Sequence, residues 1–270
     1  MLKQRIITAV ILAVLASLAL FEASNQSWQW IVLGVGFIAA WEWAGFAQIE
    51  ALWKKALYAG VTTLIGFYAV ETLSDQNILM LTVLEALLLL SVVSRYQRTQ
   101  GKVGTRSVGY VMLAGILSVV LFTTAFIHFR AEFSPQVVLM SLVVIWAIDT
   151  GAYFSGRKFG KTKLAVHVSP GKTWEGVWGG AALAFIISLI GLFLVQPELL
   201  FSEWIFALGL ALVALFSVLG DLFESVLKRQ AGLKDSGKIL PGHGGVLDRI
   251  DSLLIAVPML YLLWHFGAVA

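Results

Sequence analysis

Nine long apolar runs, separated by short polar segments, are the feature that most limits how this chain can fold. Several are shorter than the ~20 residues that a helix needs to cross the hydrocarbon of a bilayer, but flanking Trp and long cationic side chains can extend them. Only 13% of the 270 residues are charged, and the mean hydropathy is +0.87. A soluble domain of this size would have more polar surface, so the sequence predicts an all-α, polytopic integral membrane helical bundle. The runs are Ile6–Phe21, Trp30–Ala47, Ala56–Val70, Ile78–Val93, Val108–Phe129, Val137–Phe154, Gly176–Val195, Ile205–Phe223 and Ser252–Phe266.

The distribution of Lys and Arg predicts the orientation of this bundle. With the N-terminus in the cytoplasm and the sides alternating over nine transmembrane helices, every Lys and Arg except Arg130 falls on the cytoplasmic side. The positive-inside rule therefore predicts a cytoplasmic N-terminus and a C-terminus outside. The first run could instead be a cleavable signal peptide, because Lys3 and Arg5 precede it. We prefer an uncleaved span.

No internal repeat or long linker divides the chain, so we expect a single membrane domain over residues 1–270. Two cytoplasmic segments, at about 155–174 and 225–249, are too polar to be simple connections and are the expected active-site loops. The net charge of +3 is modest and gives no indication of a nucleic-acid partner. The chain has no cysteine, which excludes thiolate metal sites. Its histidines are scattered and do not predict a histidine zinc site; they are His128, His167, His243 and His265.

The stretch Ser225–Asp251 is the densest polar segment of the sequence. It combines five cations with the turn sequence Pro-Gly-His-Gly-Gly at residues 241–245, and backbone N–H groups and cationic side chains can both face polyphosphate oxygens. Asp248 and Asp251 share one face if a helix starts near Val246. The alternative is a solvated basic loop between two spans. The five cations are Lys228, Arg229, Lys234, Lys238 and Arg249.

The second polar segment is Ile148–Thr173, also on the expected cytoplasmic side. Gly-Lys-Thr occurs in it twice, but neither copy has the glycine five positions earlier that a Walker A motif needs. Ser169–Thr173 still predicts a phosphate-binding turn that opens a helix, because a helix N-terminus offers free N–H groups to an anion. An ordinary helix N-cap is the alternative.

Ionisable side chains at the ends of the spans gather at one depth. The carboxylates Asp149, Asp221, Asp248 and Asp251 all fall near the cytoplasmic ends of spans, beside both polar segments. Together with the basic stretch they predict a Mg²⁺–polyphosphate site at the membrane interface. For Asp221 the alternative is a helix-end carboxylate hydrated by headgroups. We expect Glu42 to give structural or lipid-facing support, and for Glu85 the sequence suggests no role beyond pairing across helices.

The polar stretch resembles the signature of the phosphatidate cytidylyltransferase (CDP-diacylglycerol synthase) family along its whole length. Ser-Pro-Gly-Lys-Thr-x-Glu-Gly at residues 169–176 also resembles that family. The positions that carry the resemblance are Ser225, Lys228-Arg229, Lys234-Asp235, Gly237, Leu240-Pro241, His243-Gly244-Gly245 and Asp248-Arg249-x-Asp251.

The resemblance implies a reaction in phospholipid biosynthesis: CTP and phosphatidic acid give CDP-diacylglycerol and pyrophosphate. The lipid phosphate would attack the α-phosphorus of CTP, so charge neutralisation and alignment are the main tasks and no enzyme nucleophile is needed. It further implies Mg²⁺ as cofactor, with a second cation left open. The expected place is a bacterial-type inner (plasma) membrane, with the active site facing the cytoplasm and the lipid bilayer as a partner.

We assign residue roles by applying the implied reaction to the positions that match the family pattern. We expect His243 to contact the leaving pyrophosphate or brace the loop, and Gly244 and Gly245 to let the backbone approach the phosphates. The expected metal ligands are Asp221, Asp248, Asp251 and Asp149. The expected phosphate-binding residues are Ser169, Lys172, Thr173, Lys228, Arg229, Lys234 and Arg249. Asp235 lies between Lys234 and Lys238, where an ion pair within the loop is a sufficient explanation.

Two other functions fit parts of the pattern. A CTP-using lipid kinase would need the same features but release CDP instead of pyrophosphate. A transporter would place its polar residues near the midplane, often with inverted repeats, whereas here they gather at one face. Gly176 and Gly180 form a G-x-x-x-G that predicts a close helix contact, although Gly-rich spans also produce it by chance. A homodimer is left open.

Overall fold

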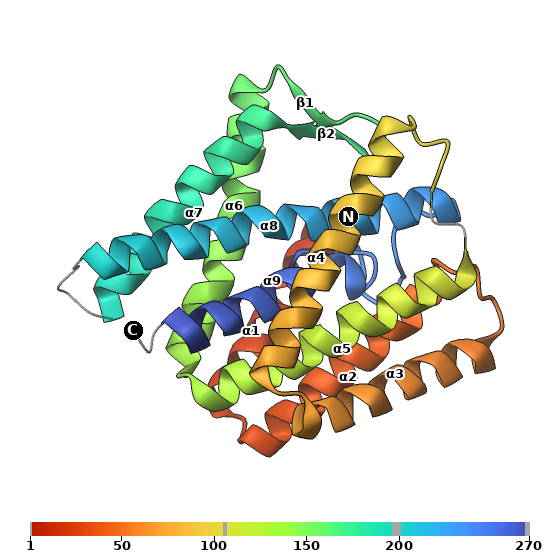
Figure 1. Cartoon of the computed structure of the whole chain (residues 1–270), viewed down its shortest axis with the longest axis horizontal. Helices are drawn as coiled ribbons and strands as arrows, with labels where there is room; N and C mark the ends of the chain where they lie inside the picture. The colour runs from red at the N-terminus through yellow and green to blue at the C-terminus, as the bar shows by residue number, and fades with distance from the viewer. Residues whose placement is uncertain (1, 105–106, 196–200, 268–270) are drawn as a thin grey trace.

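A computed structural model describes residues 2–104, 107–195 and 201–267, which form nine helices and one short hairpin (Figure 1). Arg106 lies outside the described residues, as do the side chains of Lys3 and Arg5, so these parts of the charge prediction are not placed. The helices are α1 Leu2–Glu22, α2 Asn25–Trp43, α3 Leu52–Thr72, α4 Asp75–Arg98, α5 Val108–Glu132, α6 Pro135–Phe159, α7 Trp174–Val195, α8 Phe201–Ala231 and α9 Leu247–Gly267. The strands are β1 Lys163–Ala165 and β2 Ser169–Thr173.

The helices of the described ranges coincide with the apolar runs, which confirms an all-helical membrane protein. Six of them, α4 to α9, are long and apolar enough to cross a membrane. Nine spans and the orientation of the termini stay predictions. Large apolar side chains such as Leu113 and Leu194 are 68% and 77% exposed, as expected of a surface that faces lipid.

Three short connections at one end of the bundle are built in the same way. Ser24, Ser74 and Ser134 precede α2, α4 and α6, and each accepts a hydrogen bond from the backbone N–H three residues later, at 3.1 to 3.4 Å. Such N-caps satisfy one of the free donors at a helix start. Because only two residues separate each helix from the one before it, consecutive helices return across the bundle.

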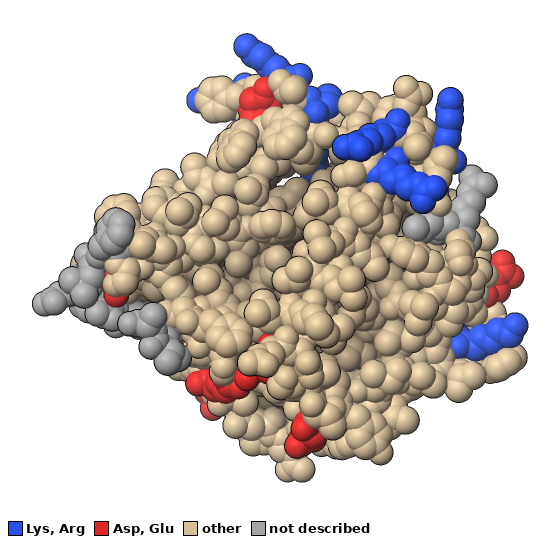
Figure 2. Space-filling view, in the orientation of Figure 1, with Lys and Arg blue, Asp and Glu red and all other residues tan. Residues whose placement is uncertain are grey.

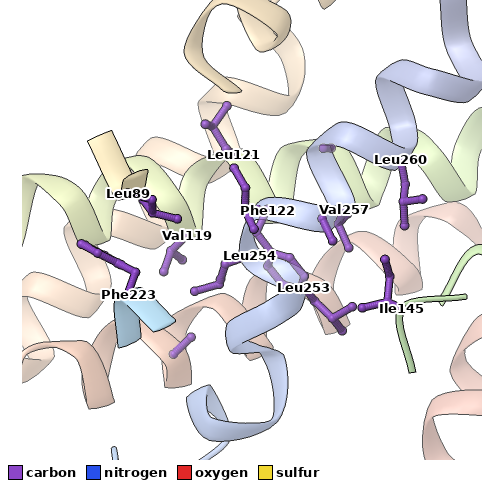
Figure 3. Close-up of a cluster of buried hydrophobic side chains, with 14 of the residues drawn as sticks. Leu89, Val119, Leu121, Phe122, Ile145, Phe223, Leu253, Leu254, Val257 and Leu260 are labelled. Carbon is purple, nitrogen blue, oxygen red and sulfur yellow. The ribbon is translucent and has the colours of Figure 1, made fainter. Parts of the chain in front are cut away.

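One buried cluster lies where α5 packs against α9, with side chains of α4, α6 and α8 around it. Figure 3 shows Val119 and Phe122 of α5 beside Leu254 and Val257 of α9, with Phe223 of α8 at the side of this cluster. All of these side chains are at most 8% exposed. In lipid the apolar surroundings resemble the core, so close packing is what favours this arrangement. As a result α9, which carries Asp248 and Asp251, is held on most of its circumference.

Helices α6 and α7 form a closely packed pair through glycine. A Cβ on Gly151 would lie 2.8 Å from the Gly180 Cα, and one on Gly180 would lie 2.4 Å from the Ile148 carbonyl oxygen. Only glycine fits where two backbones come this close. The close contact predicted for Gly176 and Gly180 is therefore confirmed, within one chain. A homodimer stays a prediction.

The hairpin β1–β2 joins the ends of α6 and α7 at the top of Figure 1. Lys163 pairs with Thr173 and Ala165 with Ser169. The prediction that Ser169–Thr173 is a turn is wrong, because this segment is a strand and the chain reverses at residues 166–168. Pro170 is compatible with this, since a two-stranded sheet has only edge strands. The prediction that the segment opens a helix is confirmed, because α7 begins at Trp174.

Charged side chains are separated on the surface. In Figure 2 most Lys and Arg lie along the upper and right-hand edges, near the hairpin and the ends of α4 and α8, while several acidic side chains lie at the lower left. Helix α8 ends at the upper right, where the link to α9 begins (Figure 1).

Candidate active site

The link between α8 and α9, residues 232–246, is shaped by glycines and tight turns. Gly232 and Gly244 have φ of +71° and +82°, a conformation that residues with a Cβ rarely adopt. The Leu233 N–H donates to the Lys228 carbonyl at 2.8 Å, which ends α8. A second turn is closed by the Leu240 N–H donating to the Gly244 carbonyl at 2.9 Å. Helix α9 begins at Leu247, so the condition under which Asp248 and Asp251 share one face is met.

Asp248, at the start of α9, is the centre of this loop. Its carboxylate accepts the Ser236 N–H at 2.9 Å, the Gly245 N–H at 2.8 Å and the Lys228 ammonium at 2.9 Å. The side chain is only 6% exposed. Charge-assisted bonds of this kind are stronger than neutral ones, so Asp248 fixes both ends of the loop to α8. The Gly245 N–H is therefore already bonded to Asp248.

Glu42 of α2 holds the same loop from the other side. Its carboxylate accepts the Leu247 N–H at 2.8 Å, the Val246 N–H at 3.2 Å and the Ser236 hydroxyl at 3.2 Å. An acid at a helix N-terminus satisfies free donors and interacts favourably with the helix dipole. A Cβ on Gly237 would lie 2.2 Å from Glu42 Oε1, so glycine is required there for the loop to approach. We call Glu42 and Asp248 the anchored carboxylates.

Lys228 lies between two acids and is mostly buried. Its ammonium contacts Glu224 at 2.5 Å as well as Asp248. Glu224 is 2% exposed and also interacts electrostatically with Asp251. Lys228 therefore links α8 to α9, and its expected contact with a substrate phosphate would have to coexist with these two ion pairs.

A second group of carboxylates is more open. Asp221 pairs with Lys172 of β2 at 2.5 Å, with the two side chains 28% and 24% exposed. Asp149 of α6 is exposed and interacts electrostatically with both. Asp251 also interacts electrostatically with Asp221. The structure thus brings the four predicted metal ligands into one continuous network, and we call Asp149 and Asp221 the open carboxylates.

A basic depression of about 590 Å³ opens beside this network. Lys234, Lys238 and Arg249 line it with His243, together with Asp235 and Gly244. Among the described residues Asp235 makes no ion pair within 4 Å, so the ion pair predicted in this loop is absent. The buried His243 Nδ1 has no hydrogen-bond partner. Cations, a half-buried imidazole and backbone turns suit an anion with several phosphates.

The remaining predicted residues lie around these two features. Thr173 accepts the Gly176 N–H at 3.1 Å and so acts as an N-cap of α7. Glu175 accepts from the backbone N–H groups of Lys161 and Thr162 and closes the base of the hairpin. Ser169 is half-buried in β2, and Arg229 is exposed near the end of α8.

The acids of the network fit a hard divalent cation. Five carboxylates, Asp149, Asp221, Glu224, Asp248 and Asp251, face two ammonium groups, which leaves three formal negative charges in excess. Within the described ranges no three of them bring one oxygen each within 4.8 Å of the others. A cation held here would need water or substrate oxygens as well, which is how Mg²⁺ is usually bound beside phosphates.

Similarity to known proteins identifies the kind of chemistry. The chain matches the cytidylyltransferase family over residues 3–266. The chain belongs to this family. It is 39% identical to a phosphatidate cytidylyltransferase of Pseudomonas aeruginosa, over 99% of this chain and 98% of the relative. It is 36% identical to one of Haemophilus influenzae, over 98% and 99%, and 34% identical to one of Bacillus subtilis, over 97% of each. The predicted family is confirmed.

Sequence reasoning missed the specific roles of two residues in this cytidylyltransferase. Glu42 was expected to be structural, but its partners lie up to 205 positions away and no local spacing reveals them. Glu224 carried no expected role, although it lies one helical turn before Lys228, where an ion pair is a standard expectation. In both cases the available signal was an acid inside an apolar run or at its margin, which is rarely present without a partner.

Proposed function

We propose that this protein transfers CMP from CTP to phosphatidic acid, producing CDP-diacylglycerol and pyrophosphate in phospholipid biosynthesis. One observation carries the proposal: a basic depression and an acidic network share the α8–α9 link of a membrane chain that belongs to the cytidylyltransferase family. Relatives that match almost end to end are named for this activity.

The basic depression and the acidic network have separate roles in bringing the two anionic substrates together. Lys234, Lys238 and Arg249 hold the CTP phosphates in the basic depression, where His243 contacts the pyrophosphate portion. Lys172, in β2 just before α7, is placed to exchange its partner Asp221 for a phosphate. The phosphate monoester of the lipid is the nucleophile. The chain therefore aligns the reactants and neutralises charge.

Mg²⁺ is the cation that this site would hold. The open carboxylates and Asp251 are the ligands with the most freedom to accept it. Asp248 has three protein donors already, so it supports the ligands by fixing α9 against α8. When bound, Mg²⁺ neutralises phosphate oxygens and stabilises the leaving pyrophosphate.

The proposed orientation puts the site at the cytoplasmic surface of a bacterial-type inner membrane. Nine spans, an inner N-terminus and an outer C-terminus follow from the positions of Lys and Arg. Since the chain has no cysteine, single cysteines report the sides directly. Cysteine at Ser134 should be labelled only from outside and cysteine at Ile239 only from the cytoplasm. Labelling of both from one side would refute the orientation.

The activity is tested with purified protein, labelled CTP, phosphatidic acid and Mg²⁺, with both products identified. We expect CDP-diacylglycerol and pyrophosphate, and none of either when phosphatidic acid is omitted. Excess EDTA should abolish the reaction, since the carboxylates alone repel a triphosphate. Full activity in EDTA would refute the role of Mg²⁺. Release of CDP with a phosphorylated polyprenol would show a lipid kinase instead.

A further inference from the structure

A second polar cluster lies at the opposite end of α9 from the candidate active site, about 25 Å away along the helix. It joins Asp75 at the start of α4, His128 and Glu132 at the end of α5, and Tyr261 and His265 at the end of α9. We call it the far-end cluster. No step of the proposed reaction uses it. The histidines that are scattered in the sequence include two that the fold brings together here.

The contacts of the far-end cluster centre on two carboxylates. The Tyr261 hydroxyl lies 2.6 Å from Asp75 Oδ1 and 2.8 Å from Glu132 Oε1. The two ring nitrogens of His265 lie 3.0 Å from Glu132 and 3.4 Å from Asp75. A tyrosine hydroxyl has one proton and can donate it to only one of the two acids. The donors that the two carboxylates share do not balance two negative charges. A further cation would therefore fit here.

Lys and Arg do not supply that cation. Within residues 2–104, 107–195 and 201–267, the ion pairs of Asp75 and Glu132 are with His265 alone. Arg130, close in sequence, donates from Nε to the Leu20 carbonyl at 2.7 Å. The acids keep side-chain exposures of 34% and 40%, so an ion can reach them from solvent.

The side chains of the cluster lie close enough together to hold a metal ion. One ligand atom each from Asp75, His128 and Glu132 lies within 4.8 Å of the other two. Ligands at ~2.1 Å from a tetrahedral zinc are separated by ~3.4 Å, so modest rotamer changes would close the site. His128 Nε2 lies 2.9 Å from the Val70 carbonyl oxygen. A histidine that donates one N–H to a backbone carbonyl keeps its other nitrogen unprotonated, as metal ligation requires.

We propose that the far-end cluster binds a divalent transition metal ion such as Zn²⁺, with Asp75, His128 and Glu132 as ligands. His265 is the fourth donor, and Tyr261, which is fully buried, orients the carboxylates through its hydroxyl. Imidazole together with carboxylate favours zinc-class ions over Mg²⁺. The ion would fasten α4, α5 and α9 together where α9 ends.

The test uses the full-length protein in detergent, stripped with EDTA, dialysed and supplied with excess Mg²⁺ to occupy the candidate active site. Addition of ZnCl₂ should then give one bound zinc per chain and a higher unfolding temperature. Co²⁺ in place of Zn²⁺ should show the visible absorption of a four-coordinate site. Tyr261→Phe should weaken zinc binding by about 10- to 100-fold, the usual effect of losing a residue that orients a ligand.

His128→Gln should lose the zinc, the absorption bands and the temperature shift, whereas the matched control His167→Gln should keep all three. Since His128→Gln could fail to fold, Glu132→Gln is measured in parallel, and its far-ultraviolet circular dichroism is checked. The absence of zinc in the resupplied wild type would overturn the proposal. So would equal zinc binding by wild type and both far-end variants, because the zinc would then be bound elsewhere.

Discussion

The anchored carboxylates differ from the open carboxylates in how many protein donors they bind. Glu42 and Asp248 each accept hydrogen bonds from three different groups, and both are almost fully buried. Asp221 has one ion pair and one long bond from Ser225, and Asp149 is exposed. Carboxylates saturated by protein donors hold a loop in shape, and carboxylates with free lone pairs can bind a cation. Residue type alone does not distinguish these roles.

Glu42→Ala should have the largest effect on stability. It removes an acceptor shared by the Val246 N–H, the Leu247 N–H and the Ser236 hydroxyl, and each buried donor left unsatisfied costs about 1–3 kcal/mol. We expect a loss on the order of 3 kcal/mol in the free energy of unfolding, with loss of CMP transfer. Thermal unfolding in detergent measures it. Glu50→Ala, at an exposed acid nearby, is the control; equal stability of the two variants would contradict an anchoring role.

Asp248→Asn should affect both stability and catalysis. The amide cannot accept from Lys228 and from both backbone donors at once, so we expect a loss of about 2 kcal/mol, in the range for an unsatisfied buried donor. The value of kcat should fall by at least ~100-fold, and extra Mg²⁺ should restore little because the loop itself is displaced. Unfolding curves and a Mg²⁺ titration of kcat are the measurements. A strong rescue by Mg²⁺ would make Asp248 a direct ligand.

Asp221→Asn should distinguish the open carboxylates from the anchored carboxylates. Its ion pair with Lys172 is partly exposed, so stability should change by no more than about 1 kcal/mol. If Asp221 binds the cation, kcat should fall by roughly 10²–10³-fold, with partial recovery at high Mg²⁺. Steady-state kinetics across a Mg²⁺ series, beside Asp248→Asn, gives the comparison. A wild-type kcat would place the cation elsewhere.

Asp235→Asn should have the smallest effect. Asp235 lines the basic depression but is exposed and makes no ion pair among the described residues. We expect a stability change within about 0.5 kcal/mol, as at most surface sites. Activity should change only a few-fold, and mainly in KM for CTP. A loss as large as that of Asp221→Asn would add Asp235 to the functional acids.

The sequence predicted the features that depend on local pattern. Apolar runs placed the helices, and three-residue spacing put Asp248 and Asp251 on one face of a helix in this position. The sequence did not predict contacts between residues that are far apart in the chain. It also did not predict where a strand forms in place of a turn. Ser169–Thr173 forms a strand because residues 163–165 are there to pair with it. The histidines of the far-end cluster are 137 positions apart, so only the packing of α5 on α9 brings them together.

The bond between Glu42 and the start of α9 has a consequence for how the protein is made. During synthesis α2 is made long before residues 236–247 leave the ribosome, so Glu42 is at first without these partners. Contacts of such high sequence separation form late, since they require most of the chain to be in place. We therefore expect the α8–α9 link to become ordered only after α9 has been made. A chain interrupted before α9 would leave Glu42 without the backbone donors of Val246 and Leu247.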